Sequence, residues 1–362
     1  MRWILFCSLA AASAFGQSTT WNLSADWSDT SNPFGPWQLN QSGIVPFTQH
    51  WTEWVPGSGQ PVWAQAPVPQ TAQIPAWGKA VQSGVLGLDV TAGSIFVHGA
   101  EFERTGSEYT SVQWTSPITG TVNLHGQVWP PRHIGREMSW FILVDGLSVT
   151  QGTFGASNPF SSANRMSLSE GTGGSSVLTV PVVPGTKIEL MVQRDPAQES
   201  SDFVALYYAI STLANPNTLS VGGTLQDFVG NAGAVPITVT ISKLDGAVVR
   251  EEVVTTNGGA PASIFAALEG TFRVAVKAPH WLRQSQDVTF DETGANLSFD
   301  LVNGDSDNDN EVGIGDYAVL SSAYGAEPGD ANWDPNADLN GDESVDIGDY
   351  AILSANYGKL GD

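Results

Sequence analysis

The sequence predicts a mainly β protein made of two β-sandwiches followed by a small α-helical module at the C-terminus. Three observations predict this class. Glycine and proline contribute 39 and 21 of the 362 residues and only 14% of residues are charged, a composition typical of short strands joined by many turns. Apolar and polar residues alternate along most of the chain, as in strands with one buried face. The final residues, 305–362, break this pattern with an acidic repeat.

Acidic residues dominate the chain and are concentrated at its C-terminal end. Thirty-seven Asp and Glu against fourteen Lys and Arg leave a net charge of −23. Residues 305–362 hold fourteen of these acids and one base, Lys359, so they carry −13 and the rest of the chain carries −10. Such a chain repels the phosphates of nucleic acids and anionic membranes. We therefore expect cations as ligands and no nucleic acid as a partner.

Residues 1–16 have the layout of a secretory signal peptide, because Arg2 precedes an apolar run from Trp3 to Phe15. The alternative is a membrane anchor, which needs about twenty apolar residues and so a longer run than this one. The sequence thus predicts a secreted protein, extracellular or at the cell surface, with no transmembrane span in the mature chain. The single cysteine, Cys7, lies in the leader, so we expect neither disulfides nor a cysteine nucleophile.

Residues 17–213 are expected to form the first β-sandwich. Period-two alternation and regular turn residues predict a jelly roll of two antiparallel sheets. The stretches WNLSADWSDTSNPFGPWQL, from Trp21, and VQWTSPITGTVNLHGQVW, from Val112, resemble the jelly-roll, carbohydrate-binding-module-like domains of secreted bacterial proteins. The strands that we expect most firmly lie at 94–98, 110–115, 120–129, 138–145, 176–182, 186–193 and 203–210.

Residues 214–303 are expected to form a second β-sandwich of six or seven short strands. The runs SVGGTLQDFVG, from Ser220, and GTFRVAVKAPHWLRQSQDVTF, from Gly270, resemble the immunoglobulin-like unit called carboxypeptidase-regulatory-like. This resemblance implies a spacer between functional modules. We expect His280 and Trp281 in that run to fill the core at a strand end rather than to bind a ligand.

Residues 304–362 contain an internal repeat, in which DSDNDNEVGIGDYAVLSSAYG from Asp305 matches DLNGDESVDIGDYAILSANYG from Asp338. Oxygen-bearing residues stand at positions 1, 3, 5, 7 and 12 of a twelve-residue loop in both copies, the spacing of an EF-hand-like calcium loop. Position 9 is Gly313 in the first copy, where we expect a water instead. The sequence therefore predicts two Ca²⁺ ions, and the expected ligands are Asp305, Asp307, Asp309, Glu311, Asp316, Asp338, Asn340, Asp342, Ser344, Asp346 and Asp349.

One short helix is expected after each loop. Tyr317, Leu320 and Tyr324 recur as Tyr350, Leu353 and Tyr357, spaced to form one apolar stripe, and Gly325 and Gly358 are expected to end the helices. Position 6 of each loop requires a left-handed backbone, which Asn310 tolerates and Glu343 adopts with strain. Val312 and Val345, at position 8, are expected to pair across the two loops.

Two such loop and helix units, joined by AEPGDANWDPNA, resemble a type I dockerin across residues 305–358. Membership of that family implies binding to a cohesin-type protein, with the two repeats offering equivalent faces. The family's partner-selecting positions 10 and 11 correspond here to Ile314, Gly315, Ile347 and Gly348. Because the familiar Ser-Thr pair is missing, we expect a more apolar partner surface than that of the best-known cohesins.

Tryptophans supply the main candidates for carbohydrate binding, because ten of the thirteen lie between Trp21 and Trp140. Indole rings can stack on the apolar faces of sugars. Most are expected in the core. Those in a Pro- and Gly-rich stretch without clear strand periodicity are expected to be exposed and to bind a polysaccharide: Trp51, Trp54, Trp63 and Trp77.

An active site is not apparent from the sequence, although glycosidases need only two facing carboxylates. The first module contains several acids but no motif pairs any two of them: Glu101, Glu103, Glu137, Asp145, Glu189, Asp195, Glu199 and Asp202. Nor do the five scattered histidines accompany a G-x-S-x-G motif: His50, His98, His125, His133 and His280. We therefore favour a non-catalytic, accessory component of polysaccharide breakdown. The alternatives are a glycoside hydrolase with its site in the first module, and a cell-surface structural protein.

Overall fold

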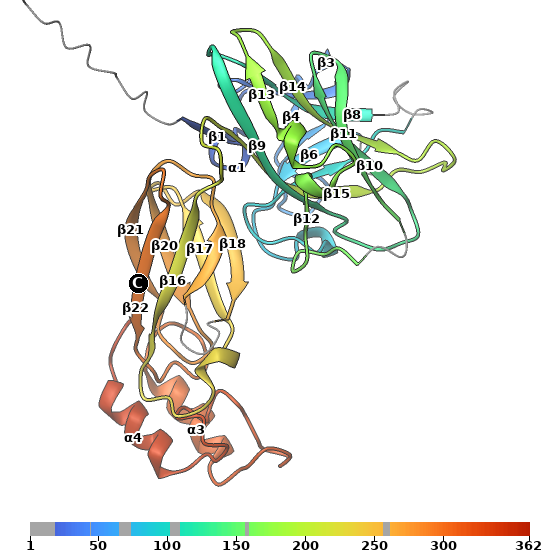
Figure 1. Ribbon diagram of the computed structural model, residues 1–362. Helices are drawn as coiled ribbons and strands as arrows, with labels where there is room; N and C mark the ends of the chain where they lie inside the picture. The colour runs from blue at the N-terminus through green and yellow to red at the C-terminus, as the bar shows by residue number, and fades with distance from the viewer. Residues whose placement is uncertain (1–18, 44, 65–73, 102–108, 156–158, 256–260) are drawn as a thin grey trace, which may run out of the picture.

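The computed structural model describes residues 19–362 apart from residue 44 and residues 65–73, 102–108, 156–158 and 256–260. The signal peptide predicted for residues 1–16 lies outside the described residues. Over these described residues the chain is mainly β, as predicted, with four sheets and short helices. Figure 1 shows the two sandwiches side by side and the helices α3 and α4 at the far end of the second. None of the helices in the described ranges is long and apolar enough to span a membrane.

The first module is a sandwich of two sheets, which confirms the predicted β-sandwich. One sheet has the order β12-β9-β15-β7-β6-β5-β4, with β1 paired to β15 and β13 paired to β9. Its strands are β1 (Thr20–Asn22), β4 (His50–Trp51), β5 (Val62–Ala64), β6 (Ala76–Lys79), β7 (Ile95–His98), β9 (Gly120–Trp129), β12 (Met166–Ser167), β13 (Thr179–Val182) and β15 (Phe203–Ser211).

The second sheet of this module has the order β11-β10-β14-β8-β2-β3. Its inward side chains meet those of the first sheet in one core, with Trp37, Trp114 and Trp140 fully buried between them. The strands are β2 (Trp37–Ser42), β3 (Val45–Pro46), β8 (Tyr109–Thr115), β10 (Met138–Val144), β11 (Leu147–Phe154) and β14 (Lys187–Arg194); short helices are α1 (Leu23–Asp26), η1 (Val85–Gly87), η2 (Leu168–Glu170) and η3 (Ser175–Leu178).

The second module is also a β-sandwich, and its seven described strands agree with the six or seven predicted. Its sheets have the orders β19-β16-β22 and β18-β17-β20-β21, with β16 and β22 parallel. Trp281 fills its core, as expected. The elements are β16 (Thr218–Leu225), η4 (Ala232–Ala234), β17 (Ile237–Ser242), β18 (Val248–Val254), β19 (Ala262–Phe265), β20 (Gly270–Lys277), β21 (Gln284–Phe290) and β22 (Ala295–Leu301).

A buried seam joins the two sandwiches. The Arg165 guanidinium makes two hydrogen bonds to the Glu252 carboxylate, at 2.5 and 2.9 Å. The Arg250 guanidinium bonds the same carboxylate and lies 3.8 Å from the centre of the Tyr207 ring. Charges removed from water need close partners of opposite charge, and here two guanidinium groups share the Glu252 carboxylate. The seam therefore holds the sandwiches as one unit rather than as beads on a flexible linker.

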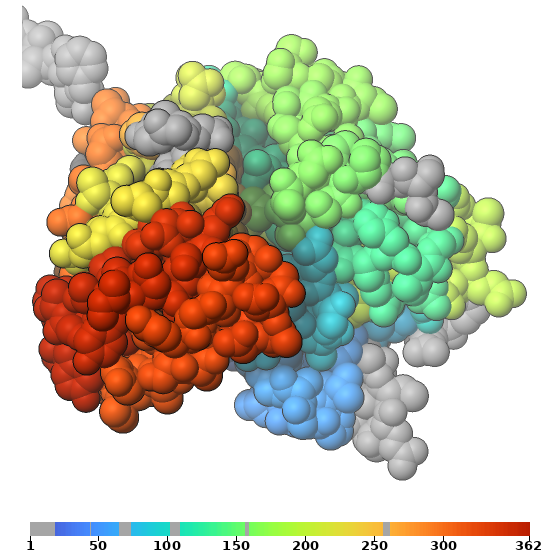
Figure 2. All heavy atoms as spheres, turned by 90° about the horizontal axis from the view of Figure 1, so that it is seen from below, coloured from blue at the N-terminus to red at the C-terminus, as the bar shows by residue number. Residues whose placement is uncertain are grey.

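The C-terminal module packs on the other end of the second sandwich, and Figure 2 shows it from that end in orange and red. It consists of two loops and the helices α3 (Ile314–Ala323) and α4 (Ile347–Asn356). Leu282, which follows β20, belongs to the core of this module rather than to that of the sandwich. Asn303 joins the two, because its side chain donates to the carbonyl of Leu339 and its carbonyl accepts from Asn356.

Candidate metal centre and docking face

The first acidic loop brings its carboxylates together. Asp305 is fully buried, and ligating oxygens of Asp305, Asp307 and Asp309 lie within 4.8 Å of one another. The Asp316 carboxylate closes the loop by accepting hydrogen bonds from the backbone N–H groups of Asp307, at 3.0 Å, and Gly313, at 2.7 Å. Asp316 thereby also caps the first turn of α3, so the helix starts at a position set by the loop.

The second loop repeats the hydrogen-bonding pattern of the first, although among the described residues only the first loop has three carboxylates grouped within 4.8 Å. The Asp338 carboxylate accepts from the backbone N–H groups of Gly341, Asp342 and Glu343. Asp349 takes the place of Asp316, accepting from the N–H groups of Asn340, at 3.1 Å, and Asp346, at 2.8 Å. In both loops, carboxylate and amide oxygens are therefore held inward by the main chain.

Left-handed residues make the tight turn in each loop. Asn310 has φ 72° and Glu343 has φ 69°, which confirms the conformation predicted for position 6. Asn308 and Gly341, at position 4, are left-handed as well, with φ 62° and 72°. A left-handed backbone costs most side chains about 1–2 kcal/mol, and asparagine less. Glu343 is thus the strained member of the four.

The donor set fits a hard divalent cation. Burial raises the pKa of Asp307, Asp338 and Asp349, and neighbouring carboxylates add to the effect. Asp305 Oδ2 is buried without a well-aligned hydrogen-bond donor, although the Lys277 ammonium lies 3.0 Å away. Several carboxylates held close together in this way repel one another, and Ca²⁺ accepts six to eight oxygen ligands in a tolerant geometry. Of the predicted ligands, Asp305, Asp307 and Asp309 are brought within 4.8 Å of one another. The binding of Ca²⁺ itself remains a prediction.

The helices place their tyrosines differently from the prediction. Leu320 and Leu353 are buried, as expected, but Tyr317, Tyr324 and their repeats are exposed. The apolar stripe is present in the second repeat, because Tyr350, Leu353 and Tyr357 line one cavity, but only the leucines reach the core. Tyr317 and Leu320 are three residues apart, so they differ by about 60° around the helix. Because the core of this module is small, that difference leaves the leucine buried and the tyrosine exposed.

Val312 and Val345 lie fully buried in one core, yet their main chains do not pair with each other. Val345 exchanges hydrogen bonds with Gly325 and Ala326, after α3. Val312 exchanges them with Gly358 and Lys359, after α4. Each loop is thus tied to the end of the other repeat's helix. The two units form one body in which neither can unfold without releasing the other.

The exposed face of the paired helices is apolar and nearly symmetric. Ile314 and Ile347, at the first turns of α3 and α4, are 73% and 66% exposed, as predicted. The rings of Tyr317 and Tyr350 meet edge to face, with centroids 5.7 Å apart. A shallow cavity of about 330 Å³ opens between the helices, and we call this surface the docking face; its cavity is lined by Ile314, Tyr317, Tyr350, Leu353, Ser354 and Tyr357.

Gly315 and Gly348 have a structural role that the sequence did not reveal. A Cβ on Gly315 would lie 2.0 Å from Asp307 Oδ2. One on Gly348 would lie 3.1 Å from the amide of Asn340 and the carboxylate of Asp346. Both glycines therefore let the helix start approach the loop oxygens. This packing requirement accounts for glycine at both positions without the predicted contact with a partner, which stays a prediction.

The four tryptophans predicted to be exposed are not. Trp54, Trp63 and Trp77 are buried and Trp51 is half-buried. Trp63 and Trp77 face each other on neighbouring strands, β5 and β6, and their indole N–H groups donate to Ser28 and Thr110. The Pro- and Gly-rich composition hid these short strands. Trp54 borders a cavity of about 240 Å³, so carbohydrate binding near it stays a prediction, but a flat exposed platform is excluded.

The candidate acids of the first module are mostly tied to structural partners. Asp202 pairs with Arg132 at 2.5 Å, and Glu101 accepts from the backbone of Ser201. Asp145, Glu189 and Asp195 likewise accept hydrogen bonds within loops or across strands. Glu103 lies outside the described residues. Among the described acids, no pair is singled out as the two carboxylates of a hydrolase.

Comparison with known proteins does not assign this chain to a family. No protein-family model and no curated protein matches the sequence. Similar solved structures include an interface mutant of a type II cohesin-X-dockerin complex from Acetivibrio cellulolyticus, with 21% identity over 40% of this chain and 97% of that chain and a TM-score of 0.33. The adhesin domain of Epf from Streptococcus pyogenes follows, with 11% identity over 77% and 96% and a TM-score of 0.21. At these TM-scores the likenesses support no conclusion about the fold or the function of this chain.

Proposed function

We propose that this chain is an extracellular calcium-binding protein that docks onto a partner protein through its C-terminal module. The observation that supports the proposal best is the exposure of Ile314 and Ile347 at equivalent places, each directly after an acidic loop. An exposed apolar surface of this kind is typical of a protein interface. Its repetition in two sequence-related units supports a role that the core does not require.

Calcium would act on this face through the helix starts. In the first loop, Asp305, Asp307, Asp309 and Asp316 would supply carboxylates and Glu311 its carbonyl; the second loop would use Asp338, Asn340, Asp342, Ser344, Asp346 and Asp349. Because Asp316 and Asp349 both close a loop and cap a helix, a cation held by them would fix the orientation of the isoleucines. Binding the ion becomes part of the folding free energy.

The resemblance to type I dockerins makes a cohesin-type module the proposed partner. The docking face offers isoleucine and tyrosine flanked by acidic loops, so a complementary surface would be apolar with a basic rim. The near-symmetry of the face would let either repeat occupy the same partner site. The whole chain would then be an accessory component of polysaccharide breakdown, with the second sandwich holding the first at a set distance from the docked end.

The test measures binding of the full chain to immobilised type I and type II cohesin modules in calcium buffer. We expect Ile314→Asp alone or Ile347→Asp alone to change the affinity little, and the double variant to weaken it by about a hundredfold or more. Leu147→Asp, at a residue 74% exposed on the first sandwich, is the matched control. Calcium titration should remain near normal in all variants.

Two results would contradict the proposal. Failure of the wild-type chain to bind any cohesin would remove the partner class. Equal binding by wild type and the double variant would show that docking uses another surface.

A further inference from the structure

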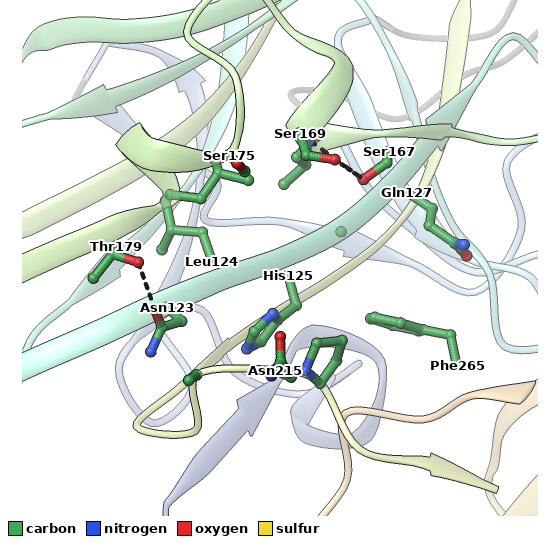
Figure 3. A pocket seen from close by; sticks show the side chains of 15 residues that line it. Asn123, Leu124, His125, Gln127, Ser167, Ser169, Ser175, Thr179, Asn215 and Phe265 are labelled. Carbon is green, nitrogen blue, oxygen red and sulfur yellow. Dashed lines mark hydrogen bonds between the residues drawn. The ribbon is translucent and has the colours of Figure 1, made fainter.

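A pocket of about 300 Å³ lies where the first sandwich meets the second. Its floor is the outer face of β9, its sides are η2, η3 and the connection 214–216, and Phe265 of β19 reaches it from the second sandwich (Figure 3). The docking face is at the opposite end of the second sandwich (Figure 1). The pocket is thus a separate site, independent of the docking proposed above.

The pocket follows from the strand pattern of β9. Val122, Leu124 and Val128 face the core, so the alternate residues Asn123, His125 and Gln127 point outward on one face. Ala209, the partner of His125 on β15, is too small to cover the imidazole. The seam ends at the edge of this place, where Arg250 contacts Tyr207 and donates to Gln127. A hollow remains.

The polar side chains that line the hollow are oriented by hydrogen bonds and still have donors available for a ligand. Thr179 donates to Asn123 Oδ1 at 2.8 Å, and Arg250 donates to Gln127 Oε1 at 3.2 Å. These bonds orient both carboxamides and leave their N–H₂ groups as donors. Asn215, on the exposed connection, forms no side-chain hydrogen bond within the described part of the chain and lines the pocket near His125 (Figure 3).

His125 is the lining residue that best supports ligand binding in this pocket. The residue is only 8% exposed, and its Nε2 is buried without a hydrogen-bond partner among the described residues. Burial lowers the pKa of this imidazole, so the ring is neutral and keeps one nitrogen able to accept. A buried polar atom without a partner is unfavourable, and a hydroxyl group placed in the pocket would supply one.

The lining also defines the class of ligand. Among the described residues that line it are amides, hydroxyls and one imidazole, but no Asp, Glu, Lys or Arg. The Arg250 guanidinium contacts Gln127 and the Phe265 ring, but it is paired with Glu252, so the lining favours an uncharged ligand. Phe265 and Pro216 supply apolar surfaces beside these groups, and Figure 3 shows the Phe265 ring at one end of the pocket. Hydroxyl-rich ligands with apolar faces match this combination. The volume is at the small end for ligand pockets, roughly 300–1,000 Å³, which limits the occupant to a small sugar unit.

We propose that the seam pocket binds a neutral carbohydrate, with His125, Asn123, Gln127 and Asn215 as its hydrogen-bonding groups and Phe265 as its stacking surface. Because Phe265 belongs to the second sandwich, the site exists only in the joined pair. The second sandwich then contributes to recognition and is more than a spacer.

The test uses the full chain and ligand-observed saturation-transfer NMR, followed by calorimetry. The probes are D-glucose, D-galactose, D-xylose, cellobiose and xylobiose at millimolar concentrations, with D-glucuronic acid as the charged probe. The free monosaccharides and the disaccharides distinguish a single sugar from the end of a glycan chain. We expect at least one neutral probe to bind and glucuronic acid to bind more weakly.

Two variants locate the site. His125→Ala removes the buried imidazole, and Asn215→Trp fills the pocket from an exposed position where folding is not at risk. Each should weaken binding by about tenfold or more, whereas Asn296→Trp, on an exposed strand position of the second sandwich, should not. Absence of binding by every neutral probe, preference for glucuronic acid, or an unchanged affinity in Asn215→Trp would each overturn the proposal.

Discussion

The two acidic loops share a sequence pattern and a backbone, but the second sandwich presents each with a different neighbour. Beside the first loop, the Lys277 ammonium lies 3.0 Å from Asp305 Oδ2 and donates to Asn308 Oδ1 at 2.9 Å. Beside the second, Phe228 packs so closely on Gly341 that a Cβ there would lie 2.2 Å from its ring. One loop faces a cation and the other an aromatic ring.

The difference shows that an internal repeat does not make two sites equivalent. A cation near the first loop already relieves part of the repulsion among its carboxylates, and it must yield when a metal ion binds. The second loop has no such competitor in the ion pairs of the described residues. We therefore expect the second loop to bind Ca²⁺ first, despite the strain at Glu343.

Removal of calcium should have the largest effect, because it leaves both sets of carboxylates uncompensated. Chelation should unfold the C-terminal module while both sandwiches remain folded, since their cores are separate. At a hundredfold excess over Kd, each ion adds about 2.7 kcal/mol of stability. Calorimetry and the near-ultraviolet signal of the exposed tyrosines would measure it. Asp305→Ala with Asp338→Ala should reproduce the chelated state, and identical thermograms with and without chelator would refute calcium binding.

Acid should weaken the junction that carries the first loop. Burial, with a smaller contribution from Lys277, lowers the pKa of His280 to about 4 from 6.5. The unfolded chain therefore takes up the proton first as pH falls, so stability is full above about pH 6.5 and decreases toward pH 4, by about 3 kcal/mol in total. The His280 carbonyl accepts from the N–H groups of Gly304 and Asp305, so the loss should reach the first loop.

Urea unfolding at pH 7 and at pH 4.5 would measure this effect. His280→Gln should lower the stability at pH 7 but flatten the difference between the two pH values. If the variant kept the same pH dependence as the wild type, carboxylates rather than His280 would be responsible.

Lys277→Met should sharpen the contrast between the loops. Removing the ammonium beside Asp305 should raise the affinity of the first loop by about tenfold, or about 1.4 kcal/mol, and leave the second loop unchanged. Calorimetric titration should then show two sites of more similar affinity. Lys243→Met, in a turn of the second sandwich remote from these loops, controls for the loss of one positive charge. If Lys277→Met and Lys243→Met changed the Ca²⁺ affinity of the weaker site equally, the Lys277 ammonium would not be competing with Ca²⁺.

Glu343→Gly should have the smallest effect. Relief of the left-handed strain at φ 69° should stabilise the second loop by about 1 kcal/mol. Asn310→Gly should instead destabilise the first loop, because Asn310 accepts from the N–H of Arg283 and donates to the carbonyl of Asp362. Thermal unfolding in calcium buffer would compare them, and a shift in the same direction for both would contradict this view of position 6.

Prediction from sequence succeeded where local chemistry dictates structure. The strand predicted at 120–129 was found with those bounds, because period-two alternation and flanking turns define it. The strand predicted at 176–182 begins later, at Thr179, after the short helix η3. Trp63 and Trp77 were placed wrongly because their strands are too short to show a period, so their burial depended on neighbours far away in sequence.

The sequence by itself determined the β-rich class, the repeated acidic loops with their left-handed turns, and the exposure of Ile314 and Ile347. These features depend on the spacing of residues along the chain and on backbone preferences. The exposure of the isoleucines follows because a small core has no room for them. Only the tertiary structure decided the seam, the pocket around His125 and the unequal neighbours of the two loops. Each of these brings together side chains from elements distant along the chain, and no local pattern records which residue of another module will oppose a given one.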